Sequence, residues 1–287
     1  MSDTPSLGII GGSGLYAFPG LQDAEQITPN TPYGNPTSPI VIGTLSGKRV
    51  AFLARHGLGH IYTPTEVNYR ANIYALKMLG VKRLVSISAC GSLREDFAPG
   101  SIVIPDQLVD FTRKRESSFF GEGMVVHLST ADPYCENLSK LTHQAVSAAG
   151  GQVHFGSVLV TIEGPRFSTK AESNLFRSWG MSIVGMTACP EAFLAREAGM
   201  CYTTMAHVTD YDVWHLTEEA VSVEMVVRTL QANTALAQQA IRIMVENLTE
   251  EVTCDCATSL KDALITHKGS IPSEVRQKYQ FLIGDTD

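Results

Sequence analysis

The stretch that decides the fold begins with Val158-Leu159-Val160-Thr161-Ile162-Glu163-Gly164-Pro165-Arg166-Phe167 and ends with Thr209-Asp210-Tyr211-Asp212. It contains three short apolar runs, each followed by polar or aromatic residues: one that starts at Val158 and leads into the Gly164-Pro165 turn, then Met181–Thr187 and Tyr202–Val208. Short apolar runs of this kind predict buried strands. Because ligands bind beyond the carboxyl ends of strands in an open α/β sheet, a site is expected where these runs end.

Strand and helix patterns also alternate outside this stretch. The expected strands are Leu7–Ile10, Arg49–Ala54, Arg83–Ser88 and Ile102–Ile104, and the expected helices are Glu66–Leu79, Leu138–Ala149, Ala188–Glu197 and Ala220–Leu248. Such alternation is typical of parallel βαβ units. We therefore expect one α/β domain with a mixed, largely parallel central sheet flanked by helices. Residues 1–248 would form this domain, and residues 249–287 a C-terminal extension packed on it.

The bulk properties exclude several classes of protein. A net charge of -7 over 287 residues, without a basic stripe, argues against a nucleic-acid surface. No apolar run approaches the roughly eighteen residues of a membrane helix, and Met1-Ser2-Asp3-Thr4 lacks the positive start of a signal peptide. A cytoplasmic protein is expected. Six cysteines are too few for a disulfide scaffold in a chain of this length, and buried small hydrophobic residues are their simplest interpretation.

A glycine-rich turn follows the first expected strand. Its glycines, Gly12 and Gly14, fit a loose dinucleotide-binding pattern with Ala17. However, Pro19-Gly20 interrupts the helix that should follow, and no acid stands about twenty residues further on. The turn is better suited to pointing backbone N–H groups at an anion. A tight turn without a ligand remains the alternative.

Hydrogen-bond donors gather at the predicted strand ends. They are Ser13, Arg55, His56, Ser88 and Thr187, together with the N–H groups of the glycine turn. One guanidinium among several neutral donors suits a small oxyanion such as phosphate. The Walker A, H-E-x-x-H and paired Cys-x-x-Cys patterns are absent. The sequence therefore gives no support for triphosphate hydrolysis or zinc chemistry, and no catalytic metal is expected.

Two apolar residues and two acids lie among these donors. Phe167 and Met186 would be out of place in a site for phosphate alone, so an apolar planar ligand is predicted beside it. Asp210 and Asp212 are two residues apart, which puts both carboxylates on one side of an extended segment. A solvated strand end is the alternative interpretation of the pair.

Several motifs, in the same order, resemble the trimeric purine nucleoside phosphorylases, and specifically their 5′-methylthioadenosine phosphorylase branch. The resemblance covers roughly residues 7 to 248. It is carried by Gly8-Ile9-Ile10-Gly11-Gly12-Ser13-Gly14-Leu15, Ala54-Arg55-His56-Gly57, Ala89-Cys90-Gly91-Ser92-Leu93-Arg94-Glu95, Thr161-Ile162-Glu163-Gly164-Pro165-Arg166-Phe167-Ser168, Met186-Thr187, Pro190-Glu191 and Thr209-Asp210-Tyr211-Asp212.

The resemblance implies a nucleoside phosphorylase-like fold and a role for each matching residue. Phosphate, a co-substrate rather than a cofactor, would be held by Ser13, Arg55, His56, Ser88, Thr187 and the backbone of Ala89. Phe167 would stack on the purine, Met186 would lie against the ribose, and Asp210 and Asp212 would act on the base as catalytic residues. His127 would reach the 5′ substituent from a neighbouring subunit, which implies a homotrimer.

The implied reaction converts methylthioadenosine and phosphate into adenine and 5-methylthioribose 1-phosphate, in purine and methionine salvage. A 6-oxopurine nucleoside or methylthioinosine phosphorylase is the nearest alternative, and a nucleoside-binding module without catalysis is an alternative of another class. The tail with Cys254-Asp255-Cys256 resembles that of heat-stable members with disulfides, where Cys135 and Cys201 would form a further pair.

Overall fold

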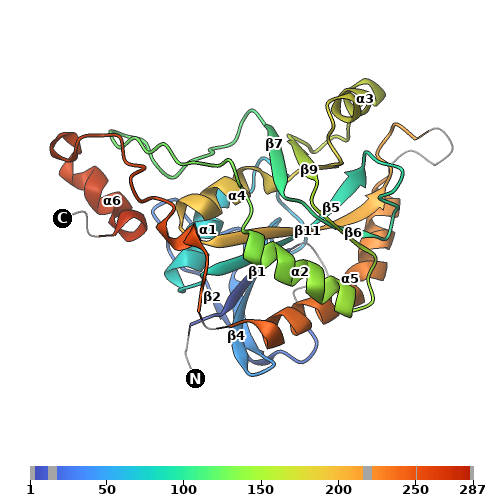
Figure 1. Ribbon diagram of the computed structural model, residues 1–287. Helices are drawn as coiled ribbons and strands as arrows, with labels where there is room; N and C mark the ends of the chain where they lie inside the picture. The colour runs from blue at the N-terminus through green and yellow to red at the C-terminus, as the bar shows by residue number, and fades with distance from the viewer. Residues whose placement is uncertain (1–3, 12–17, 216–221, 250, 285–287) are drawn as a thin grey trace.

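A central mixed sheet organises the computed structural model, which describes residues 4–11, 18–215, 222–249 and 251–284 (Figure 1). Eleven strands join this sheet within the described residues. They are β1 (Leu7–Gly11), β2 (Gln22–Ile27), β3 (Ile40–Leu45), β4 (Lys48–Ala54), β5 (Arg83–Ser92), β6 (Ile102–Ile104), β7 (Gln107–Phe111), β8 (Val153–Phe155), β9 (Val158–Ile162), β10 (Ile183–Gly185) and β11 (Cys201–Asp210).

The strand directions confirm the predicted fold class. The pairs β1–β4, β1–β5, β5–β11, β9–β10, β7–β9 and β6–β8 are parallel. The pairs β2–β3, β3–β4, β5–β10 and β6–β11 are antiparallel. Because β1, β4, β5 and β11 run in the same direction, their carboxyl ends meet at one edge of the sheet, where the sequence predicts the site.

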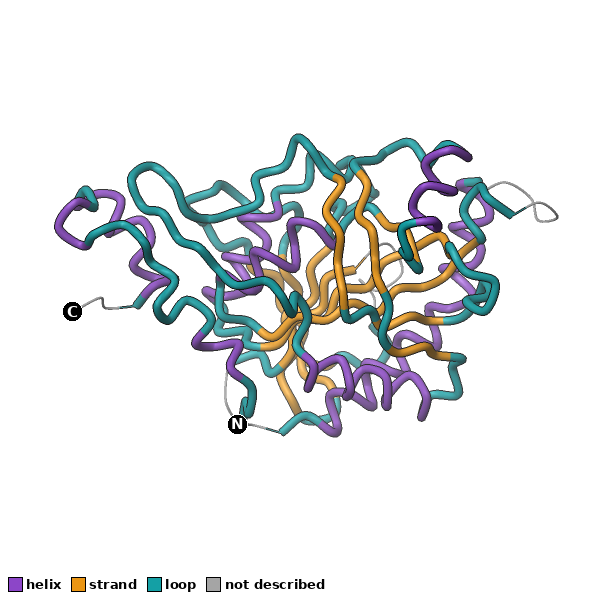
Figure 2. Tube along the Cα trace, turned by 45° about the horizontal axis from the view of Figure 1, so that its top comes forward, coloured by secondary structure: helices purple, strands orange, loops and turns teal. Residues whose placement is uncertain are grey.

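The described residues form the helices α1 (Tyr69–Met78), α2 (Glu136–Ala148), α3 (Lys170–Ser178), α4 (Ala188–Glu197), α5 (Val223–Asn247) and α6 (Ser273–Ile283). Four of these helices cover the two faces of the sheet. On one face, α2 and α5 lie side by side and pack on residues such as Ile9 and Val85 (Figures 1 and 2). On the other face, α1 and α4 pack on Ile10 and Leu84. The chain therefore has three layers with an apolar core on each side of the sheet.

Strand β5 changes partners along one of its edges. It pairs with β1 through Leu84–Ser86 and with β10 only from Gly91. Among the described strands, residues 87–90 have no ladder partner on that edge, whereas β11 covers the opposite edge from Arg83 to Gly91. The interval is 4 residues long and leaves backbone groups of β5 uncovered at the predicted site.

Local signals set the ends of the elements. Helix α1 begins after Asn68, whose side chain accepts a hydrogen bond from the backbone N–H of Ala71, and it ends before Gly80, which has a φ of 83°. The long strand β5 extends past Ser88, where the expected strand ended, because β11 pairs with it as far as Gly91. Strands β2 and β7 were not expected. The sequence of β2, QDAEQI, is largely polar, and that of β7, QLVDF, has an apolar run of only two residues.

The tail after α5 crosses the surface of the core. It forms two 3₁₀ turns, Asp255–Thr258 and Lys268–Ser270, before α6. Helix α6 packs Val275 and Tyr279 against Met124 in a small cluster of its own. Among the described residues, no helix combines the length and apolarity needed to cross a membrane.

Candidate active site

A cavity of about 540 Å³ opens at the carboxyl ends of β5 and β11. Its lining includes the predicted residues Arg55, His56, Ser88, Ala89, Phe167, Met186, Thr187, Asp210 and Asp212. A second hollow, of about 570 Å³, lies between Leu93 and Ser182 and contains none of the predicted residues. The fold therefore brings most of the predicted site together in one place.

One predicted residue falls outside the described part of the chain, and another lies away from this cavity. Ser13 and the glycine turn lie outside the described residues. His127 is exposed and does not line the cavity of its own chain. Its backbone N–H donates to Ala263 at 2.9 Å, which fixes it against the C-terminal tail.

Arg55 is buried beneath the cavity and is held mainly by Glu191. Its Nε donates to Glu191 Oε2 at 2.7 Å, and its Nη2 donates to Glu191 Oε1 at 2.9 Å. Nη2 also donates to Ser86 Oγ at 2.6 Å, and Nη1 donates to the carbonyl of Ile87 at 3.2 Å. A guanidinium has five N–H donors. Among the described residues, one Nη1 hydrogen is left for a ligand.

His56 is uncharged at neutral pH. Burial, reinforced by the positive charge of Arg55, lowers the pKa of His56 to about 4. Nδ1 lies 2.9 Å from the carbonyl of Tyr62, which can only accept, so Nδ1 carries the proton and Nε2 carries a lone pair. The ring stacks on His60 with centroids 4.3 Å apart. At neutral pH, His56 therefore offers an acceptor rather than a donor to an incoming ligand.

The remaining donors lie at the uncovered edge of β5 and at the start of α4. Thr187 is the N-cap residue of α4, and its hydroxyl makes no capping hydrogen bond. Ile87 turns its carbonyl towards Arg55, and Ala89 two residues on has the same backbone orientation, so its N–H points to the same uncovered edge. Unpaired backbone N–H groups favour anions, whereas the non-helical φ of -102° at Cys189 means that Thr187 does not begin an uninterrupted helix. This end of the cavity is suited to phosphate.

Asp210 and Asp212 occupy the acidic end of the cavity. Burial raises the pKa of Asp210 to about 6, although Thr209 Oγ1 at 2.6 Å and the backbone N–H of Asp212 at 2.7 Å both donate to it. Burial also raises the pKa of Asp212. Its Oδ2 is buried and makes no direct hydrogen bond among the described residues, although the hydroxyls of Ser173 and Ser168 lie close enough to oppose the rise of its pKa. One acid is therefore easily protonated near neutral pH, and the other has an oxygen available for a donor.

The backbone at this pair differs from the extended segment that the spacing predicts. Strand β11 ends at Asp210, and Asp212 has a φ of 52°, in the left-handed region. The carboxyls still converge, because the turn folds Asp212 back onto Asp210. Gly91 makes room for them: a Cβ there would lie 3.0 Å from Asp210 Oδ1.

Apolar side chains separate the two ends of the cavity. Phe167 and Met186 line it as predicted, and α5 adds a wall of small aliphatic residues: Val223, Val226, Val227, Leu230 and Ala237. Apolar walls with a few placed polar groups are typical of small-molecule sites. A flat apolar ligand with polar edges fits this arrangement.

Two residues of the site had no sequence signal. The side chain of Arg115 is 1% exposed and binds Glu163 Oε1 at 3.2 Å. It also donates to the carbonyls of Met186, Cys189 and Glu163 at 2.6–2.7 Å, so it joins the ends of β9 and β10 to the start of α4. It lies in a charged segment that looks like a solvated loop. His207 lines the cavity with both ring nitrogens buried and unpartnered among the described residues. Burial lowers its pKa to about 4.

Residues 6–246 match the model of a family described as the phosphorylase superfamily. The chain therefore belongs to the phosphorylase superfamily, as the combination of an anion end and an acidic end in one cavity also indicates. Within it, the S-methyl-5′-thioadenosine phosphorylase of Geobacter sulfurreducens is 50% identical over 97% of this chain and 98% of its own length. The enzyme of that name from Koribacter versatilis is 49% identical over 97% of this chain and 95% of its own length.

Solved structures agree with this placement. A methylthioadenosine phosphorylase from an Antarctic soil metagenomic library superposes with a TM-score of 0.93 at 46% identity, covering 98% of this chain and 99% of that one. The methylthioadenosine phosphorylase from Schistosoma mansoni in complex with adenine superposes with a TM-score of 0.85 at 35% identity, covering 90% of this chain and 98% of that one. Both the fold and the family predicted from the sequence motifs are confirmed.

Proposed function

We propose that the protein cleaves S-methyl-5′-thioadenosine with phosphate, giving adenine and S-methyl-5-thioribose 1-phosphate. The observation that carries the proposal is the acidic pair: Asp210, with a pKa raised to about 6, lies beside an unpartnered Asp212 Oδ2 in the cavity that also holds the anion donors. A pentosyl transfer to phosphate needs both the anion-binding end and the acidic end of the cavity. Relatives of this protein carry the name of this reaction.

At the acidic end, Asp210 and Asp212 contact different atoms of the base. As the bond between N9 and C1′ of the nucleoside breaks, its electron pair moves onto the purine and makes N7 more basic. Protonated Asp210 donates to N7, since a pKa near the working pH favours a general acid. Asp212 Oδ2 accepts a hydrogen bond from the N6 amine. Thr209 serves both charge states of Asp210, because its hydroxyl can donate to the carboxylate or accept from the acid while donating to the carbonyl of Cys90.

At the other end, a phosphate oxygen forms the new bond to C1′. The donors that would hold the anion are Ser13, Arg55, Ser88, Thr187 and the N–H of Ala89. His56 offers a lone pair at Nε2, which matches the one protonated oxygen of monohydrogen phosphate. These groups supply position and electrostatic stabilisation to a ribosyl group with oxocarbenium character. The step uses phosphate as co-substrate, and we propose that it needs no cofactor or metal.

The nearest alternative is phosphorolysis of a 6-oxopurine nucleoside or of methylthioinosine. Such bases present an oxygen acceptor at position 6, where an ionised Asp212 would repel it. The unpartnered oxygen of Asp212 therefore favours a 6-amino base.

We also propose that the working form is a cytoplasmic homotrimer in which His127 serves a neighbouring site. Val125 and Ile265 flank His127 on paired segments and are 48% and 59% exposed, so a partner subunit would cover an apolar patch there. In this proposal residues 1–248 form the catalytic domain and residues 249–287 an extension packed on it.

The experiment that tests the function is an assay of base release. Methylthioadenosine, adenosine and methylthioinosine are each incubated with the protein, with and without phosphate. We expect adenine release from methylthioadenosine only when phosphate is present, with methylthioribose 1-phosphate as the second product. A nucleoside-binding module would release no base, and a 6-oxopurine enzyme would prefer methylthioinosine.

A further inference from the structure

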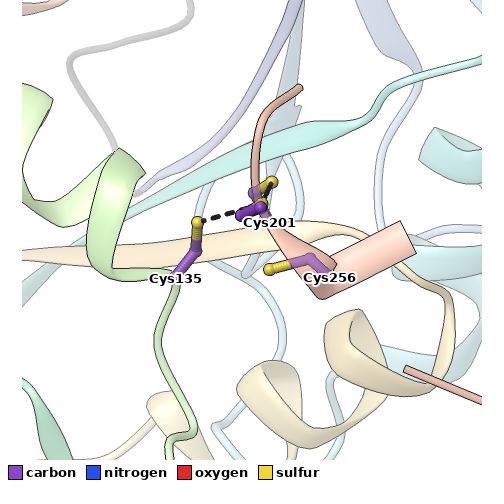
Figure 3. A group of neighbouring side chains, drawn as sticks. Cys135, Cys201 and Cys256 are labelled. Carbon is purple, nitrogen blue, oxygen red and sulfur yellow. Dashed lines mark hydrogen bonds between the residues drawn. The ribbon is translucent and has the colours of Figure 1, made fainter. Parts of the chain in front are cut away.

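Four cysteines from distant parts of the chain come together near the amino end of β11, whereas the active-site cavity lies at the carboxyl end of that strand. Cys135 precedes α2, Cys201 begins β11, and Cys254 and Cys256 lie in the tail. All four sulfur atoms lie within 4.8 Å of one another. Figure 3 shows Cys135, Cys201 and Cys256 approaching from three separate elements. None of the four lines the active-site cavity.

The separations between the sulfurs suit a shared metal ion. Cys201 Sγ and Cys254 Sγ are 3.2 Å apart, and Cys135 Sγ and Cys254 Sγ are 3.6 Å apart. Zinc binds thiolates tetrahedrally at about 2.3 Å, which places neighbouring sulfurs about 3.8 Å apart. These two separations lie slightly below this value, and all the sulfur–sulfur separations stay within 4.8 Å. The separations also exceed the roughly 2.05 Å of a disulfide, and all six cysteines of the chain are free thiols.

The surroundings of the cluster favour a closed, negatively charged centre. Cys135, Cys201 and Cys256 are buried within the main apolar cluster, which leaves little room for water. Arg196 Nη1 donates to Cys256 Sγ at 3.4 Å, and its Nε is buried without a hydrogen-bond partner among the described residues. A zinc ion with four thiolates carries two negative charges, so the half-buried guanidinium of Arg196 beside it supplies compensation from outside the ligand set.

We propose that Cys135, Cys201, Cys254 and Cys256 bind one structural zinc ion. The Cys-x-Cys pair alone offers two ligands, and the fold adds the other two. Four sulfur ligands leave no open position, which is the arrangement of structural rather than catalytic zinc sites. The ion would fasten the tail to the start of α2 and to β11, next to the core. It plays no part in the phosphorolytic step.

The test begins with the reduced protein, purified without chelator from cells grown with added zinc. Bound zinc is measured by plasma mass spectrometry in the wild type, in Cys254→Ser, and in the control Cys189→Ala, whose buried thiol lies outside the cluster. We expect one equivalent of zinc per chain in the wild type and the control, and almost none in Cys254→Ser. Removing zinc with a chelator should lower the unfolding temperature of the wild type and leave that of Cys254→Ser unchanged.

A second measurement covers the case in which Cys254→Ser fails to fold. Cobalt(II) is added to chelator-treated, reduced wild type, and a tetrahedral four-thiolate centre gives intense visible and near-ultraviolet bands that zinc abolishes by displacement. The proposal is overturned if reduced wild type holds no zinc and gives no such bands. It is equally overturned if Cys254→Ser retains its zinc. Two disulfides in place of the centre would appear as only two alkylatable thiols per unreduced, denatured chain, together with no bound zinc.

Discussion

Arg55 and Glu191 form a bidentate ion pair directly beneath the cavity, although they are 136 residues apart in the chain. Both side chains are almost fully buried, at 2% and 1% exposed. The pair joins the end of β4 to α4, so the residue proposed to bind phosphate is itself fixed in place by a carboxylate. We therefore expect Arg55 to have two roles, one in stability and one in ligand binding. A substitution of Arg55 should affect both roles.

Arg55→Ala should lower the stability of the folded protein, so its effect on phosphate binding cannot be measured separately. Arg55→Ala leaves the Glu191 carboxylate buried and unpaired, which typically costs about 3–5 kcal/mol. The double variant Arg55→Ala with Glu191→Ala should recover part of this loss. Urea unfolding of both variants is the measurement. Equal destabilisation of the single and double variants would show that the ion pair is not what holds this region.

Arg55→Lys tests phosphate binding separately from stability, because the lysine keeps a positive charge that can still reach Glu191. Losing a directed charge-assisted hydrogen bond of about 1.5–3 kcal/mol should raise the KM for phosphate roughly tenfold or more. The KM for methylthioadenosine should change little. Unchanged phosphate saturation in a folded Arg55→Lys would remove Arg55 from the anion site.

Asp210→Asn tests the assignment of the general acid. An amide can donate a hydrogen bond to N7 or O6 but cannot transfer a proton, so adenine release should fall by about 10²–10⁴-fold while the relative use of methylthioinosine rises. Asp96→Asn is the matched control, since its carboxyl is exposed and paired with Arg94. If Asp210→Asn keeps the wild-type preference for the 6-amino substrate, base recognition rests on other residues.

The same substitution should stabilise the folded protein at neutral pH. Burial raises the pKa of Asp210 from 3.8 to about 6, so the folded state binds this proton more tightly than the unfolded state does. The contribution of Asp210 to stability is therefore most favourable below pH 4 and is lost as the pH rises to about 6. This difference amounts to on the order of 3 kcal/mol. Urea unfolding should show the advantage of Asp210→Asn over wild type growing between pH 4 and pH 7.5, and a pH-independent difference would contradict the raised pKa.

Arg115→Lys tests a positioning residue that touches no substrate. A lysine cannot bond the carbonyls of Met186, Cys189 and Glu163 together, so the wall that carries Met186 and Thr187 should shift. Misplacement on this scale should lower kcat/KM for methylthioadenosine by roughly 10–10²-fold. The control is Arg113→Lys, an exposed neighbour in the same segment. A merely structural role would reduce stability and leave the kcat/KM of the folded enzyme intact.

Co-expression of two defective chains tests the shared site. His127→Ala and Asp210→Asn chains should each be poorly active alone. Mixed oligomers should recover activity, because an Asp210→Asn subunit can lend its His127 to the intact acid of a His127→Ala neighbour. Absence of recovery, or sedimentation of a fully active monomer, would contradict the proposed assembly.

The sequence motifs predicted the fold class and the family better than the bounds of every strand. Strong local patterns located β6 and α4 at their observed bounds and the start of β9 at Val158, because apolar runs with flanking turn residues leave little choice. The edge strands β2 and β7 escaped detection, since pairing with β3 and β9 rather than their own composition makes them strands. Tertiary pairing also carried β5 beyond Ser88.

Some residues of the candidate site could be predicted from the sequence, and others depend on contacts between distant parts of the chain. Residues at strand ends, such as Arg55 and Thr187, were found because the fold class says where to look. Glu191 belonged to a matching motif, yet its partnership with Arg55 is a long-range contact that spacing does not encode. Arg115 had no signal at all, because a charged loop looks solvated until its partners, the carbonyls of Met186 and Cys189, are placed in space.

The uncovered interval of β5 between Ser86 and Gly91 determines which changes the site can tolerate during evolution. A donor that belongs to the main chain does not depend on the identity of the side chain, so the side chain at position 89 can vary while its N–H remains. Ordinary substitutions cannot delete that group. Proline can, because it has no N–H. Lengthening β1 or β10 until the ladder closed would also remove it, so natural variation should conserve the ends of these two strands more strictly than the side chain at position 89.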